Sequence, residues 1–327
     1  MLLPVVGDEG QAALARAHAV IVGVGALGCA SADQLVRAGV GRVTLIDRDV
    51  VELTNLQRQT LYTELDARER RPKAVAAAER LASINAEIAI TPVIADLTSR
   101  NAAALLRGAS VLIDGTDNFE TRLLINDVSV RDAIPYAYAG VVGVTAMWGA
   151  FTPGGACLRC VVPEVPAPGS LPTCDTAGVL GAAVQTAASG QCVEVLRVLL
   201  GHIDPQRRVL TEQDCWRGTR REVRLVADPA CPCCAMRRFE FLEGKGSDTA
   251  VLCGQNAVQV SPESPASIDL PAMAKRLCTL GVVTLSPHML RASVDGHELT
   301  IFADGRAIVK GTTRPEAARA LYARLMG

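Results

Sequence analysis

Residues 20–59 read "VIVGVGALGCASADQLVRAGVGRVTLIDRDVVELTNLQRQ", and this stretch decides the fold. A short apolar run leads through a glycine-rich turn into a helical pattern, and a second apolar run ends at Asp47. A strand, a helix and a further strand in this order are the unit from which parallel sheets are built. The stretch therefore predicts an α/β fold.

The same alternation continues through the next eighty residues. The expected elements are a helix over 71–85, strands over 87–94 and 109–117, and a helix over 119–132. Strands that alternate with helices favour a parallel sheet covered on both faces. From 135 to 153 the sequence becomes strand-rich, as in "IPYAYAG" and "VTAMWGAFTP". We expect a Rossmann-like, mostly parallel sheet that is extended by antiparallel strands.

The second half of the chain predicts a change of architecture. A Pro/Gly-rich loop over 161–172 interrupts regular structure, and "EGKGSD" has the composition of a linker. The elements expected there are a long Ala-rich helix over 176–201, strands over 207–211, 222–227, 297–304 and 306–311, and helices near 270–280 and 314–326. We predict a larger α/β domain over 1–242, a linker over 243–249 and a small α+β C-terminal unit over 250–327.

Bulk composition restricts the partners and the compartment. The net charge of −1 gives no reason to expect nucleic acid or an anionic membrane as a partner. The first 19 residues lack the basic start and apolar core of a signal peptide. We therefore expect a cytoplasmic protein, whose eleven cysteines are mostly thiols or metal ligands rather than disulfides.

The turn "GVGALG" has the features of a phosphate-binding loop. Gly23, Gly25 and Gly28 allow close approach of the backbone, and the helix that follows presents unpaired N–H groups. Asp47 lies about twenty residues on, where a carboxylate can accept hydrogen bonds from ribose hydroxyls. NAD and ATP would be served equally, and the alternative is tight strand–helix packing without a ligand.

The segment "TNLQRQ" favours ATP. Arg58 places a permanent cation near the phosphates, and Asn55 and Gln57 add amide donors. A site that stabilises a charged transition state at phosphorus needs cations, whereas a dehydrogenase needs only backbone donors for a pyrophosphate. Lys73 could bring a second cation from the next helix; the alternative for Lys73 is a solvated helix residue.

The segment "DGTDNFETRLLIN" ends the fourth strand with carboxylates. Ligands of open parallel sheets bind beyond the carboxyl ends of the strands, so Asp117 can hold a phosphate-bridging Mg²⁺. The alternative is an N-cap for the helix that begins near Phe119, a role that Asp117 or Asn118 would fill well. Each residue could fill one of the two roles.

The chain resembles the ThiF/MoeB/HesA branch of the ubiquitin-activating-enzyme superfamily over roughly residues 4–240. The resemblance rests on four segments in this order: "GVGALG", "LIDRDVVELTNLQRQ", "RPKAVAAAERLASIN" and "DGTDNFETRLLIN". The resemblance implies ATP-dependent adenylylation of the C-terminal glycine of a ubiquitin-like sulfur carrier that ends in Gly-Gly. Such carriers serve molybdopterin, thiamine or tRNA-thiolation pathways. Pyrophosphate would be released, and the enzyme would act as a homodimer.

The resemblance also implies roles for individual residues. Gly23 to Gly28 would line the nucleotide and Asp47 would bind the ribose; Asn55, Arg58 and Lys73 would contact phosphates, and Asp117, with Asn118 beside it, would bind Mg²⁺. The nucleophile is a carboxylate that is already ionised at pH 7, so positioning and charge neutralisation suffice without a general base.

Two cysteine pairs predict a metal site. Cys157 and Cys160 in "CLRC", with Cys231 and Cys234 in "CPCC", supply the four thiolates of a structural zinc. Cys233 could compete with Cys234, although the x-x spacing favours Cys234. Buried free thiols are the alternative, and the family resemblance supplies zinc at these positions.

Cys174, in "LPTCDTAGVLG", precedes the long helix. The dipole of that helix would favour a thiolate, while Asp175 would oppose it. The resemblance implies a catalytic loop cysteine that forms a thioester or persulfide-linked species with the carrier. Sulfur relay and a merely exposed loop cysteine both stay open.

Two other functions compete with adenylylation. A nicotinamide-dependent oxidoreductase would need a proton-transfer residue near the cofactor, and neither His18 nor His202 is suitably placed in sequence. The second alternative is an inactive relative that acts as a binding partner. It is supported by the start "MLLPVVGDEGQAAL", which lacks the "R-Y-x-R-Q" segment that the family usually has. Residues 245–327 have no rhodanese-like "C-R-x-G-x-R" loop, so we expect a separate sulfur donor.

Overall fold

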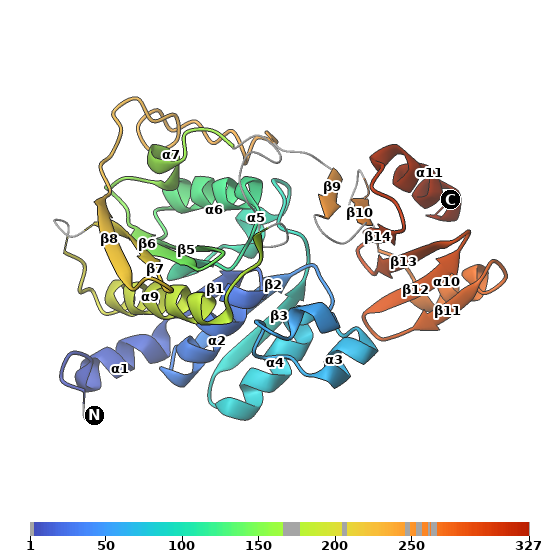
Figure 1. Cartoon of the computed structure of the whole chain (residues 1–327), viewed down its shortest axis with the longest axis horizontal. Coiled ribbons are helices and arrows are strands. Elements are labelled where there is room, and N and C mark those ends of the chain that lie inside the picture. The colour runs from blue at the N-terminus through green and yellow to red at the C-terminus, as the bar shows by residue number, and fades with distance from the viewer. Residues whose placement is uncertain are drawn as a thin grey trace. The chain divides into compact units, whose positions relative to one another are not determined.

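The first apolar run forms β1 (His18–Val22), a central strand of an eight-stranded sheet in a computed structural model of the chain. The structure describes residues 3–165, 177–204, 208–245, 249–252, 257–260, 262 and 267–326. It divides into two units, Met1–Lys245 and Gly246–Gly327. Figure 1 shows the eight-stranded sheet within the first unit.

Five strands of this sheet are parallel and three are antiparallel. The order is β3-β2-β1-β4-β5-β6-β7-β8. The parallel strands are β1, β2 (Arg42–Asp47), β3 (Ala89–Ile94), β4 (Val111–Asp114) and β5 (Tyr136–Val142). The strands β6 (Thr145–Phe151), β7 (Val209–Asp214) and β8 (Thr219–Arg224) add antiparallel pairs. The predicted mostly parallel sheet with an antiparallel extension is confirmed.

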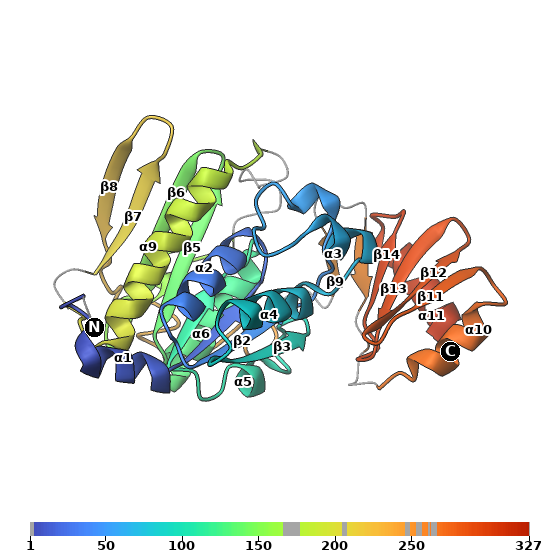
Figure 2. The same ribbon diagram turned by 90° about the horizontal axis from the view of Figure 1, so that it is seen from below.

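Helices cover both faces of the sheet, because successive strand residues point to opposite sides. Ile21 and Leu45 face one core, and Val20 and Ile46 face the other. The first core includes α1 (Gly7–Arg16), α2 (Ala26–Arg37), α4 (Lys73–Ile84) and α9 (Gly181–Leu199); the second includes α5 (Ala102–Leu105) and α6 (Phe119–Asp132). Figure 2 shows α9 lying along β5 and β6.

Short elements complete the first unit, and two expected strands differ from the prediction. The short helices are η1 (Leu53–Asn55), α3 (Glu64–Glu69) and α7 (Leu158–Val161). The strands expected over 207–211 and 222–227 form the hairpin of β7 and β8. Both strands extend further towards the turn than predicted, since β7 ends at Asp214 and β8 begins at Thr219. Asp214 accepts from the backbone N–H groups of Trp216 and Arg217, and Gly218 takes a φ of +71°, so these residues make the turn.

The apolar helix α9 is a core helix. Its Gln191 is fully buried and donates to the backbone carbonyls of Asp114 and Ala137, both at 2.9 Å. Ser31 donates to the same side chain at 2.7 Å. Across the described ranges, none of the helices has the length and apolar character that crossing a membrane requires.

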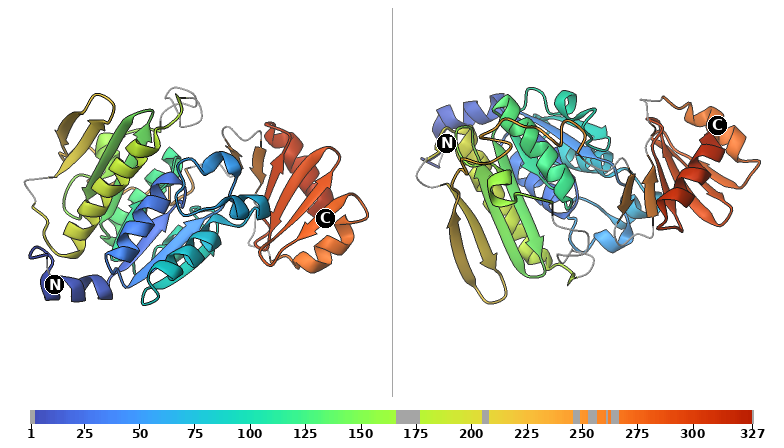
Figure 3. Two further views of the ribbon diagram at one scale, coloured as in Figure 1. Left: turned by 60° about the horizontal axis from the view of Figure 1, so that its bottom comes forward. Right: turned by 90° about the horizontal axis from the view of Figure 1, so that it is seen from above.

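The second unit is an antiparallel sheet with two helices on one face (Figure 3). Its strand order is β11-β12-β13-β14-β10-β9. The elements are β9 (Thr249–Leu252), β10 (Ala257–Val260), α10 (Leu270–Leu277), β11 (Val282–Leu285), β12 (Met289–Val294), β13 (His297–Phe302), β14 (Ala307–Lys310) and α11 (Pro315–Met326). Both helices were expected, but of the strands only β13 and β14 were. The Asp295–Gly296 turn, with φ of +51° and +75°, is the hairpin feature that predicts β12.

Three glycines allow the ends of β1 and β4 to meet the start of α2. A Cβ atom at Gly28 would lie 1.9 Å from the carbonyl oxygen of Gly23, and one at Gly115 would lie 2.1 Å from the same oxygen. Gly23 itself has a φ of +82°. Because β1 lies between β2 and β4, these glycines stand where the chain turns to opposite sides of the sheet, which is where open α/β sheets bind ligands.

We expect Gly28→Ala to lower the free energy of unfolding by about 3 kcal/mol or more, because the added carbon meets backbone rather than a flexible side chain. Urea unfolding followed by circular dichroism measures this change. Gly25→Ala is the matched control. The atom nearest to its added Cβ would be Nε2 of Gln59 at 3.9 Å, so the loss of stability should stay at about 1 kcal/mol. Equal losses in the two variants would contradict the packing argument.

Candidate functional site

The N-terminus of α2 opens onto the carboxyl ends of β1 and β4. Gly25 is its N-cap residue and has no side chain with which to accept from the first helical N–H groups. These groups, together with the positive end of the helix dipole, form a suitable site for an anion. The three glycines of the predicted phosphate loop therefore have different roles. Gly23 and Gly28 allow the backbone of the turn and of α2 to pack closely, and Gly25 leaves the N-terminus of α2 without a side-chain cap.

Asp47 ends β2 beside this turn. Its Oδ2 accepts from the N–H of Val24 at 2.6 Å, and its Oδ1 accepts from the N–H of Asp49 at 2.7 Å. Burial raises the pKa of this carboxyl, although Lys73 opposes the shift. Each carboxylate oxygen has two lone pairs, so Asp47 can still accept from hydroxyl groups while it holds the turn.

Lys73 is buried beside Asp47 and Asp49. It is the first residue of α4, it is only 6% exposed, and its Nζ lies 3.2 Å from Oδ2 of Asp49. Burial alone would lower the pKa of this ammonium, but Asp49 and then Asp47 raise it above its ordinary value. The alternative of a solvated helix residue is wrong. Lys73 is a charged group held at the edge of the nucleotide loop.

Asp117 and Asn118 separate into the two roles that the sequence left open. Oδ1 of Asn118 accepts from the N–H groups of Glu120 at 2.8 Å and Thr121 at 3.4 Å, and so caps α6. The carboxylate of Asp117 is exposed at the end of β4 and acts electrostatically on Lys73. Asn118 therefore fills the capping role, and Asp117 stays available for a cation.

The loop after β2 carries the predicted amide and guanidinium donors. Arg58 donates from Nη1 to the carbonyl of Thr54 at 3.4 Å, a contact within its own loop. The side chain of Gln57 is exposed, and that of Asn55 is half-buried. None of the contacts in the described residues joins these three side chains to Lys73 or Asp117. The structure thus brings Lys73, Asp47 and Asp117 together, and leaves Arg58 on the adjacent loop.

Gln59 is a site-lining residue that the sequence analysis missed. It is 5% exposed, and its Oε1 is buried without a hydrogen-bond partner among the described residues. Its Nε2 approaches Gly25 of the phosphate loop. A glutamine at the end of "TNLQRQ" has no periodic pattern of its own, so only the three-dimensional fold places it here.

Two further residues, Tyr62 and Arg122, hold the backbone segments that carry the site. Tyr62 donates to the carbonyl of Val24 at 2.6 Å and approaches the carbonyl of Lys73 at 3.3 Å, which ties the turn to α4. Arg122 is buried; its Nε lies 3.1 Å from Oδ2 of Asp114, and its Nη2 donates to the carbonyl of Thr116 at 2.7 Å. The strand end that carries Asp117 is thereby held in place.

The arrangement as a whole can bind a polyphosphate and a hydrated divalent cation. Helix N–H groups and Lys73 provide positive charge, while Asp117 provides an exposed carboxylate at the same edge of the sheet. Mg²⁺ takes one or two carboxylates, keeps several waters and bridges phosphate oxygens. The residues present fit ATP with Mg²⁺. Cys174, the remaining predicted catalytic residue, lies outside the described residues.

The four predicted metal ligands lie together. The Sγ atoms of Cys157, Cys160, Cys231 and Cys234 are all within 4.8 Å of one another. The Cys157–Cys231 and Cys160–Cys234 sulfur distances are 3.7 and 3.4 Å. Four thiolates around zinc at bonds of about 2.3 Å would be separated by about 3.8 Å, so the cluster fits tetrahedral zinc.

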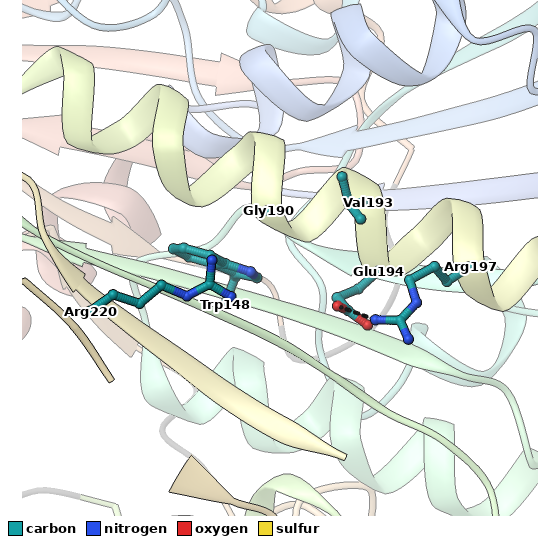
Figure 4. Close-up of a pocket in the computed structure, with 6 residues that line it drawn as sticks. All are labelled: Trp148, Gly190, Val193, Glu194, Arg197 and Arg220. Carbon is teal, nitrogen blue, oxygen red and sulfur yellow. Dashed lines mark hydrogen bonds and ion pairs between the residues drawn. The ribbon is translucent and has the colours of Figure 1, made fainter. Parts of the chain in front are cut away.

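A cavity of about 480 Å³ lies away from both sites, between α9 and the antiparallel strands. Figure 4 shows Trp148 beneath Gly190 of α9, with Arg220 over the indole and the Glu194–Arg197 pair beside it. Its lining contains none of the predicted site residues. The chemistry argued above therefore belongs to the strand ends and not to this cavity.

Comparison with known proteins identifies the family. The model of the ThiF family matches residues 1–233, which include the phosphate loop, Lys73, Asp117 and all but one of the four clustered cysteines. The chain belongs to the ThiF family. The family resemblance that the sequence predicts is confirmed.

Several relatives extend this result. A sulfur carrier protein ThiS adenylyltransferase of Bacillus subtilis is 41% identical over 98% of this chain and 96% of its own length. A sulfur carrier protein adenylyltransferase of Thermus thermophilus is 40% identical over 72% of this chain and 88% of its own length. A crystal structure of E. coli MccB with MccA-N7isoASN superimposes with a TM-score of 0.61, at 23% identity and over 68% of each chain, and shows the same fold.

We expect Arg122→Gln to destabilise this ThiF-family domain by about 3–5 kcal/mol, because it leaves the carboxylate of fully buried Asp114 without its cation. Chemical denaturation measures the loss. The control is Arg68→Gln, which breaks a pair with Glu64 whose side chains are 69% and 68% exposed and should change stability by no more than about 0.5 kcal/mol. A loss at Arg122 as small as the control's would refute the supporting role.

Proposed function

We propose that this protein uses ATP to adenylylate the C-terminal glycine of a ubiquitin-like sulfur carrier, with release of pyrophosphate. The Bacillus subtilis relative, a ThiS adenylyltransferase by name, supports this proposal because it matches both units of the chain. Relatives named SAMP-activating enzyme E1 and MOCS3 adenylyltransferase and sulfurtransferase agree with the same reaction class. Within this class the similarity favours a ThiS-like carrier ending in Gly-Gly.

One structural observation carries the choice of ATP: Lys73 is buried, charged and adjacent to the phosphate loop. A nicotinamide dinucleotide needs only neutral backbone donors for its pyrophosphate, so a buried cation would serve no purpose there. Transfer at phosphorus concentrates negative charge on the phosphate oxygens, and a fixed cation stabilises that charge. The site therefore supports adenylyl transfer better than hydride transfer.

The proposed mechanism assigns a task to each side chain. The turn Gly23–Gly28 binds phosphates through its N–H groups, Asp47 accepts from the ribose, and Asn55, Gln57, Arg58 and Lys73 contact phosphate oxygens. Asp117, beside Asn118, would hold Mg²⁺, which would supply positive charge to neutralise the phosphates. A carrier carboxylate oxygen forms a bond to the α-phosphorus while the bond to the β-phosphate oxygen breaks. The electron pair leaves with pyrophosphate, and an acyl-adenylate remains.

We propose that the cysteine cluster binds a structural zinc ion. Four thiolates complete a tetrahedral shell and leave no position for a substrate, so the ion would stabilise the fold without taking part in the reaction. We also propose a homodimer, a separate sulfur donor, and Cys174 as the residue that could link covalently to the carrier. The domain limits 1–242 and 250–327, joined by 243–249, remain part of the proposal.

Removal of either charged side chain, Lys73 or Asp117, should strongly reduce the reaction rate. We expect Lys73→Gln and Asp117→Asn to reduce carrier-dependent ATP–pyrophosphate exchange by about 100-fold or more, because the first removes a cation beside the phosphates and the second a carboxylate that would hold Mg²⁺. Asp132→Asn changes an exposed carboxylate on the far end of α6 and should leave the exchange unchanged. Intact-mass spectrometry of the carrier should show the adenylate with the wild-type protein.

Three results would count against the proposal. NADH rather than ATP with Mg²⁺ could protect the protein in a thermal shift experiment, which would favour an oxidoreductase. The protein could bind the carrier and never exchange pyrophosphate, which would favour an inactive binding partner. Exchange at the wild-type rate in Lys73→Gln and Asp117→Asn would refute the site.

Zinc removal should destabilise the first unit. We expect purified protein to contain about one zinc per chain, and Cys160→Ser to lower both zinc content and melting temperature. Atomic absorption and a thermal melt measure the two effects. Cys278→Ser is the control, since Cys278 is exposed and lies outside the cluster. Zinc-free protein with the wild-type melting temperature would contradict the assignment.

A further inference from the structure

A fifth cysteine, Cys233, is buried beside the four clustered cysteines. It is 1% exposed, and it belongs to the same apolar cluster as Cys157 and Cys231. Cys231-x-Cys233 and Cys231-x-x-Cys234 offer alternative pairs of thiols, which are chemically identical as metal ligands. What differs between Cys233 and Cys234 is the set of hydrogen bonds around each sulfur.

Two side chains of α6 hold the sulfur of Cys233. Nδ2 of Asn126 donates to it at 3.3 Å, and the thiol donates to Oδ1 of Asp127 at 3.4 Å. Both α6 residues are fully buried. The Sγ of Cys234 lies 3.4 Å from that of Cys160 and within the group of four, and Cys233 also interacts with Cys157. Cys233 is therefore engaged by hydrogen bonds on the side that faces α6.

The same two α6 residues also bind the backbone next to each cysteine pair. Oδ1 of Asn126 accepts from the N–H of Leu158 at 2.7 Å, which lies between Cys157 and Cys160. Oδ2 of Asp127 accepts from the N–H groups of Phe241 at 2.8 Å and Leu242 at 3.3 Å, beyond the second pair. Each residue thus contacts Cys233 with one atom and a flanking segment with another.

Ligation by Cys233 would disrupt this arrangement. Ligation would draw the Cys233 sulfur towards the other ligands and away from Asn126 and Asp127, which now lie 3.3 and 3.4 Å from it. Oδ1 of Asp127 would then lose its donor in a buried position, which is costly. Ligation by Cys234 leaves all of these hydrogen bonds in place.

We propose that Asn126 and Asp127 are positioning residues of the metal site, which hold the Cys233 side chain by hydrogen bonds and so select Cys234 as the fourth ligand. The inference rests on the proposed zinc site. It does not depend on adenylyl transfer, because it concerns ligand choice, which can be measured in the absence of ATP and carrier.

Cobalt substitution of the full chain tests this assignment, because Co²⁺ in a tetrahedral site absorbs according to the number of thiolates bound. We expect Cys233→Ser to keep the four-thiolate spectrum and one metal ion per chain. Cys234→Ser should lose about one quarter of the thiolate-to-cobalt charge-transfer intensity, since three ligands remain. Asp132→Asn, at the exposed end of α6, is the control and should match the wild type.

Release of Cys233 completes the test. In Cys234→Ser, the added changes Asn126→Ala and Asp127→Asn should free Cys233 and restore the lost charge-transfer intensity. Loss of a thiolate in Cys233→Ser would overturn the proposal, as would a full four-thiolate spectrum in Cys234→Ser alone. Failure of the combined variant to regain intensity, while it remains folded and metal-bound, would show that the two α6 residues do not control ligand choice.

Discussion

The close approach of backbone at Gly23, Gly28 and Gly115 is the constraint on which the rest of the site depends. The carbonyl oxygen of Gly23 occupies space that a Cβ atom at either of the other two positions would need. Without this approach the start of α2 could not lie against the ends of β1 and β4. The open helix end, the carboxylate of Asp47 and the strand end that leads to Asp117 would then no longer share one edge of the sheet.

Charge at this edge is arranged before any ligand arrives. Lys73 lies 3.2 Å from Asp49 and also interacts with the charge of Asp47, and Arg48 lies 3.2 Å from Asp96. Buried ion pairs contribute little to stability, since desolvation offsets their attraction. Their value here is that Lys73 stays charged and fixed, so that little reorganisation is needed when phosphate charge develops.

The sequence predicted those features that repeat or stand in a defined order. Alternating apolar strands and helices predicted the mostly parallel sheet, and the glycine turn placed Gly23 and Gly25 correctly at the end of β1. Gln59, Tyr62 and Arg122 could not be predicted, because their contacts join segments that only folding brings together. Burial of Lys73 was missed for the same reason: its neighbour Asp49 is 24 residues away in sequence. The strands of the second unit are short, and the Asp295–Gly296 turn was the one local feature that marked β12.

Helix α6 connects the proposed nucleotide site with the cysteine cluster. Its first turn is capped by Asn118 next to Asp117, Arg122 binds the end of β4, and Asn126 and Asp127 hold the cysteine pairs. Cys157 and Cys231 are 74 residues apart, and the chain between them includes α9 and the β7–β8 hairpin. A metal cross-link at its base would close this long loop, and closing long loops removes the most conformational entropy from the unfolded chain. A metal ion bound by these cysteines would therefore support the proposed nucleotide site without taking part in the chemistry, because it would hold in place the helix that begins beside Asp117.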